Sequence, residues 1–96
     1  MERFDHDDDG YLAWIASHPR GLVINCFANP SADYLVLHRA SCSSITIKQV
    51  DKEHWTHDYI KVCAQERGEI LVWCYSEAGR APTACQICDP LAPTAS

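Results

Sequence analysis

Two short motifs hold the side chains of this sequence that are best suited to bind a metal ion. His38 and Cys42 form an H-x3-C pair, and Cys85 and Cys88 form a C-x2-C pair followed by Pro90. One imidazole and three thiolates make a Cys3His ligand set, which binds Zn²⁺ with tetrahedral geometry. Because four protein ligands leave no position for a water molecule, the motifs predict a structural zinc site rather than a catalytic one.

The C-x2-C pair has other uses that must be weighed. A redox pair of this spacing follows a strand and opens a helix, whereas Asp89 and Pro90 follow here, which disfavours redox chemistry. A disulfide and an iron site remain alternatives to zinc. The other three cysteines fall on expected strands or on a helix face, and we interpret them as buried apolar residues. They are Cys26, Cys63 and Cys74. Of these, Cys63 is the alternative ligand if His38 does not bind.

The N-terminal aspartates have the spacing of a calcium loop without its ending. Residues 5–10 spell D-x-D-x-D-G, but the twelfth position of the loop is Ala16, where calcium binding needs a bidentate glutamate. We therefore expect these carboxylates at the start of a helix, where they meet free backbone N–H groups and the positive end of the helix dipole.

No pattern in the sequence indicates a catalytic site. It contains neither a G-x-S-x-G nucleophile motif nor a phosphate-binding loop, and we expect no catalytic residues and no enzymatic activity. His54, Trp55 and His57 belong to a polar and aromatic segment that we interpret as a solvated loop. Arg20 and Arg39 are candidates for contact with a small anion, with no motif to support that role.

The helices and strands that must position the ligands are predicted from the spacing of apolar residues and from the residues that end such elements. Apolar residues at helical spacing predict helices over residues 10–17 and 66–78, and Gly79 suits the C-terminal cap of the second. Apolar β-branched runs predict strands over 22–27, 34–38 and 59–63, with a further short strand at 45–47 and loops at 28–33 and 50–58. The prediction is a small α+β fold, in which an antiparallel sheet of three or four strands and two helices are cross-linked by one structural zinc.

Composition limits the organisation and the partners of the chain. Its 96 residues suffice for a single domain, with an acidic lead-in at 1–9 and a frayed tail at 91–96. A core of this size is marginal, which favours a metal cross-link. The formal net charge of −5 disfavours direct binding to a phosphate backbone. No apolar run approaches membrane-spanning length and residues 1–9 do not read as a secretion signal, so we expect a cytoplasmic protein with no membrane partner.

The order of these features resembles the metal-binding domain of the Ada DNA-repair protein. In both, two ligands four residues apart follow a strand, and a C-x2-C-x-P loop follows a helix that ends in glycine. The resemblance covers residues 34–90, and implies that His38, Cys42, Cys85 and Cys88 bind the metal. This chain has a longer segment between the two ligand pairs. It also has His38 where the repair protein has its methyl-accepting cysteine, so that activity does not carry over.

The resemblance implies a small zinc-binding interaction module that is accessory to nucleic-acid processing or defence in bacteria. Its partner would be a protein, or a nucleic acid reached through a protein partner. One alternative is a zinc-thiolate repair or sensor protein that alkylates itself on Cys42 or Cys85. Another is an acidic inhibitor or antitoxin-like protein that mimics nucleic acid with its cluster at Asp5 to Asp9.

Overall fold

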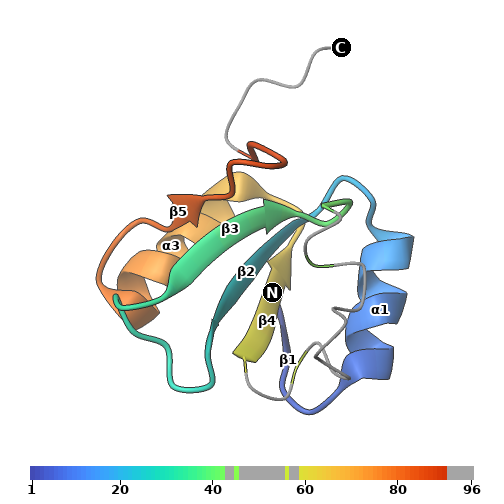
Figure 1. The fold of residues 1–96 in the computed structure, drawn as a ribbon, viewed down its shortest axis with the longest axis horizontal. Coiled ribbons are helices and arrows are strands. Elements are labelled where there is room, and N and C mark those ends of the chain that lie inside the picture. The colour runs from blue at the N-terminus through green and yellow to red at the C-terminus, as the bar shows by residue number, and fades with distance from the viewer. Residues whose placement is uncertain (43–44, 46–55, 57–58, 91–96) are drawn as a thin grey trace.

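The chain forms two helices and one sheet over the residues that the computed structural model describes, which are 1–42, 45, 56 and 59–90. The elements are β1 (Glu2–Phe4), α1 (Asp8–Ser17), β2 (Leu22–Phe27), β3 (Leu35–Arg39), β4 (Tyr59–Ala64), α3 (Arg67–Ala78) and β5 (Thr83–Ala84). The five strands lie in the order β1-β4-β2-β3-β5 (Figure 1). Neighbouring strands are antiparallel except β3 and β5, which are parallel. The α+β prediction is confirmed.

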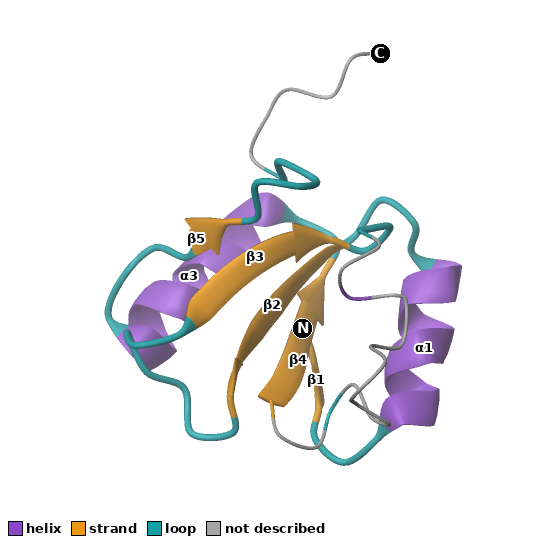
Figure 2. Ribbon diagram, viewed as in Figure 1, coloured by secondary structure: helices purple, strands orange, loops and turns teal. Residues whose placement is uncertain are grey.

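The central strand β2 is buried on both faces because the two helices cover different sides of the sheet. Successive side chains of a strand point to opposite faces. Ile24 and Cys26 therefore join the core that contains Ile70 of α3, whereas Val23 joins the core that contains Tyr11 of α1. Figure 2 shows α3 behind the sheet and α1 next to β1. The apolar run that predicted this strand reflects burial on both faces.

The helix ends are set by the residues that the sequence marks for them. The Asp7 carboxylate accepts a hydrogen bond from the Gly10 N–H at 3.0 Å and caps the N-terminus of α1. Gly79 ends α3 in the left-handed conformation, with φ of 78°, and donates its N–H to the Tyr75 carbonyl at 3.1 Å. The Gly79 cap confirms the prediction for the end of α3, whereas α1 begins at Asp8, two residues before its predicted start, because Asp7 provides the cap.

The two edge strands were not predicted, and the sheet has five strands rather than three or four. The lead-in at 1–9 contains β1, which pairs with β4, and the segment after Gly79 contains β5, which pairs with β3. Strands of three and two residues are too short to show alternation, so no pattern in the sequence could reveal them. The expected strand at 45–47 lies outside the described residues except for Ile45, which is not in the sheet. The loop at 50–58, except Thr56, and the tail at 91–96 also lie outside them.

Candidate metal centre

The first two candidate ligands come from the end of β3 and the turn that follows it. His38 lies opposite Val23 of β2, on the sheet face that packs against Tyr11 of α1, and its side chain is buried. Strand pairing ends after Arg39, and the chain reverses in a turn closed by a hydrogen bond from the Cys42 N–H to the Arg39 carbonyl at 3.0 Å. This reversal brings Cys42 back toward His38, which explains why an H-x3-C spacing suits the end of a strand.

The other two ligands come from a tight turn that directly follows β5. The Cys85 N–H donates to the Leu37 carbonyl at 2.9 Å, which extends the parallel pairing of β5 to the strand that carries His38. The Asp89 N–H then donates to the Cys85 carbonyl at 2.9 Å and closes a loop with both C-x2-C cysteines. Two chain segments 43 positions apart are thereby held against each other.

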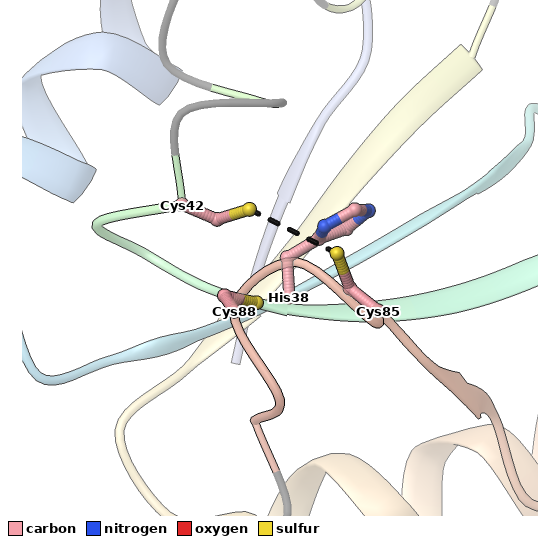
Figure 3. A group of neighbouring side chains, drawn as sticks. All are labelled: His38, Cys42, Cys85 and Cys88. Carbon is pink, nitrogen blue, oxygen red and sulfur yellow. Dashed lines mark hydrogen bonds between the residues drawn. The ribbon is translucent and has the colours of Figure 1, made fainter.

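The ligand atoms of His38, Cys42, Cys85 and Cys88 all lie within 4.8 Å of one another (Figure 3). The Sγ atoms of Cys42 and Cys85 are 3.9 Å apart. In a tetrahedral site with Zn–S bonds of about 2.3 Å, two sulfurs are about 3.8 Å apart. Three of the four residues are buried and Cys88 is partly exposed. The four side chains could therefore hold a metal ion.

The protonation of His38 suits metal binding. Burial, with a contribution from the charge of Lys61, lowers the pKa of the His38 imidazole from 6.5 to about 4. The ring is therefore neutral at physiological pH and keeps a lone pair for coordination. A neutral imidazole is the form in which histidine binds metal ions.

The pKa values of the two cysteines of the C-x2-C loop are shifted in opposite directions, because burial dominates at Cys88 and hydrogen bonds dominate at Cys85. Burial opposes ionisation of Cys85, but the backbone N–H groups of Cys88 and Ile87 stabilise its thiolate and lower its pKa below the ordinary value. Burial raises the pKa of Cys88 to about 12, against the effect of a hydrogen bond from the Arg39 backbone. A bound cation would have to displace the proton of Cys88, which couples metal affinity to pH.

The remaining three cysteines are in the apolar cores. Cys26 and Cys74 lie in the core under α3, and Cys63 lies in the core under α1. Burial raises the pKa of Cys26 and Cys74 to about 11 and that of Cys63 to about 12. The group of four potential ligands contains His38 and not Cys63. All six cysteines lie in the described part of the chain, and none of them forms a disulfide there.

Arg39 lies beside this group and contacts the loop that carries Cys88, which no motif predicted. Its backbone N–H donates to the Cys88 sulfur at 3.2 Å. Its guanidinium donates from Nε to the Cys88 carbonyl at 2.8 Å and from Nη2 to the Asp89 carbonyl at 2.9 Å. These acceptors are backbone atoms about fifty positions away, so no residue type in the sequence marks them.

The other candidate residues fall elsewhere. Asp7 caps α1, and the Asp8 carboxylate accepts hydrogen bonds from the Thr56 N–H at 2.8 Å and from its hydroxyl at 2.7 Å. The predicted use of the aspartates at a helix start is confirmed for Asp7. The polar and aromatic segment of His54, Trp55 and His57 lies outside the described residues.

Comparison with known proteins returned no relatives. No family model matches the chain, and neither the curated proteins nor the solved structures include a significant match. The resemblance to the Ada metal-binding domain therefore remains a hypothesis based on the motif. Within the described residues, neither helix has the length and apolar character needed to cross a bilayer.

Proposed function

We propose that this protein is a small zinc-binding interaction module. One structural Zn²⁺, held by His38, Cys42, Cys85 and Cys88, would join the end of β3 to the C-terminal loop. The observation that carries the proposal is the convergence of one imidazole and three thiols within 4.8 Å, with a sulfur separation close to the edge of a zinc tetrahedron.

A structural role is favoured over a catalytic one by the composition of the site. Four protein ligands fill a tetrahedral Zn²⁺, which leaves no coordination position for water or substrate. Three of the four residues are buried, so a reactant has limited access. Because thiols bind the metal only in reduced form, the proposed site also requires a reducing compartment such as the cytoplasm.

An interaction role is supported by apolar side chains on the outer surface. On α3, Val72 is 66% exposed and Tyr75 is 60% exposed, three positions apart on one side of the helix. Ile87, in the loop between Cys85 and Cys88, is 74% exposed. Exposed apolar groups of this kind suit contact with a protein partner better than contact with a phosphate backbone, as does the net charge of −5. A setting in nucleic-acid processing or defence rests on the motif resemblance.

Metal content and thiol accessibility test the zinc site. Protein purified without chelator or a nickel column should contain one zinc per chain by elemental mass spectrometry. Three thiols should resist a thiol reagent until chelator is added. The Cys85→Ala variant should lose the zinc, whereas Cys74→Ala, which removes a buried sulfur in the opposite core, should keep it. Metal-free protein, or equal zinc loss in both variants, contradicts the assignment.

A pair of surface variants tests the interaction role. Val72→Glu with Tyr75→Glu should keep the zinc and the melting temperature but reduce the recovery of a co-purifying partner. Glu77→Lys is the charge control, because Glu77 is exposed on the same helix but lies two positions from Tyr75 and five from Val72, on another side of the helix. Equal recovery with all variants shows that this surface does not bind the partner.

A further inference from the structure

Arg39 connects the two halves of the candidate metal centre. It directly follows His38 at the end of β3, and its side chain extends to the loop that carries Cys88. Three of its groups donate there, namely the backbone N–H to the Cys88 sulfur and two guanidinium N–H groups to the carbonyls of Cys88 and Asp89. The planar fork of a guanidinium can hold two acceptors in a fixed geometry, which a single ammonium group cannot do in the same way.

The residue that Arg39 holds has an unfavourable backbone conformation. Asp89 has φ of 45°, in the left-handed region that a residue with a Cβ rarely adopts. The conformation is held from both sides, because the Asp89 N–H donates to the Cys85 carbonyl and the Asp89 carbonyl accepts from Arg39. Without the guanidinium, the end of the loop would relax toward commoner backbone angles, and the Cys88 sulfur would move with it.

The charge of Arg39 also suits the centre. Three thiolates and one Zn²⁺ carry a net charge of −1, and a guanidinium adjacent to the loop compensates for it. The backbone N–H of Arg39 donates to the sulfur of the most exposed ligand, which stabilises its thiolate form. Groups that orient ligands and balance charge in this way determine how tightly a site holds its metal.

We propose that Arg39 is a positioning residue of the metal centre, which fixes Cys88 for coordination and retains the metal. This inference rests on the proposed zinc site. It assigns a role to a residue outside the ligand set, since Arg39 acts on the metal only through Cys88 and the backbone of Asp89.

Cobalt titration of the full chain tests the proposal, because Co²⁺ bound by thiolates absorbs visible light. Arg39→Gln should weaken Co²⁺ binding 10- to 100-fold, the usual effect of removing a group that orients a metal ligand. Arg39→Lys keeps the charge and the long stem but not the fork, and should also weaken binding by about 10-fold or more. Circular dichroism of each variant confirms that it is folded.

Arg80→Gln is the matched control for the loss of a forked arginine. The Arg80 side chain also donates to two backbone carbonyls, those of Ala32 and Ala81 at 2.8 and 2.7 Å, but it holds a different loop. Its variant should bind Co²⁺ within about twofold of wild type, well inside the range expected for a positioning residue. A second measurement is the alkylation rate of metal-loaded protein, in which Arg39→Gln should expose Cys88 while Cys42 and Cys85 stay protected.

The possible failures are distinguishable. If wild type binds Co²⁺ and Arg39→Gln binds it equally well, the role of Arg39 is overturned while the metal centre stands. The same conclusion follows if Arg39→Lys binds like wild type, or if Arg80→Gln weakens binding as much as Arg39→Gln. If wild type binds neither Co²⁺ nor Zn²⁺, the metal centre itself is overturned, and the role of Arg39 with it.

Discussion

Removal of one sulfur from the proposed metal centre should destabilise this protein far more than removal of a core sulfur. Cys85→Ala and Cys74→Ala each delete a single buried Sγ, so the comparison holds the chemistry of the substitution constant. The first deletion would open the proposed metal link between segments 43 positions apart, whereas the second would leave a small cavity in the core that contains Ile70. The difference between them isolates the contribution of the metal cross-link.

Loop closure sets the expected size of the effect. A cross-link between residues about 40 positions apart lowers the conformational entropy of the unfolded chain, which raises the free energy of unfolding by about 4 kcal/mol. Domains of this length have total stabilities of about 5–15 kcal/mol, so losing the link removes a large fraction. With a melting-temperature shift of about 4–8 °C per kcal/mol, Cys85→Ala should melt roughly 15–30 °C below wild type. Cys74→Ala should lose only about 1–2 kcal/mol through its cavity.

Thermal denaturation with and without chelator provides the assay. Chelator should lower the melting temperature of wild type and of Cys74→Ala, because both carry the metal, and should leave Cys85→Ala unchanged. The reasoning is refuted if Cys85→Ala melts together with Cys74→Ala and still responds to chelator. That result would mean that the sulfur of Cys85 is not a ligand, whatever metal the protein contains.

Three further predictions concern single groups. The free energy of unfolding of metal-free protein should fall by roughly 2 kcal/mol as the pH drops from 6.5 to about 4, because His38 is protonated in the unfolded chain over this range but stays neutral in the folded protein. Urea titrations at several pH values should show this decrease, and His38→Gln should abolish it. Gly79→Ala should destabilise the protein by about 1 kcal/mol, because alanine is strained at a φ of 78°. Gly68→Ala should stabilise it by a similar amount, because an added Cβ meets open space there. Thermal melts in which both variants shift the midpoint in the same direction would contradict this. Asp7→Ala should remove the α1 cap and about 1 kcal/mol, measurable by the same melts, and an unchanged midpoint would show that the cap contributes nothing.

The parts of the fold that the sequence predicts are those with a long enough pattern. The predicted strand 22–27 matches β2 in both bounds, and α3 begins within one residue of its predicted start. Burial on both faces and a 12-residue helical repeat leave clear signals. The edge strands β1 and β5 have no such signal, because their positions depend on partners elsewhere in the chain.

The candidate metal site was predictable in its ligands but not in its surroundings. Cysteine and histidine are few and chemically distinct, so the spacing of His38, Cys42, Cys85 and Cys88 identified the group that the structure brings together. Arg39 was considered only as a contact for a small anion, and its contacts with the loop were missed because they are made to carbonyl oxygens, which every residue possesses. A sequence records side chains, and contacts to the backbone become visible only in three dimensions.

The parallel pairing of β3 with β5 has a consequence for how the protein is made. The ribosome delivers His38 and Cys42 first, and Cys85 follows Cys42 only after 43 further positions of the chain. The antiparallel strands β1 to β4 can begin to pair while synthesis continues, but a site with four ligands cannot close until β5 has emerged and docked. During that interval a nascent chain presents only the half of the proposed site that holds His38 and Cys42. Metal capture by all four ligands would therefore follow the docking of β5 rather than guide the pairing of the other strands.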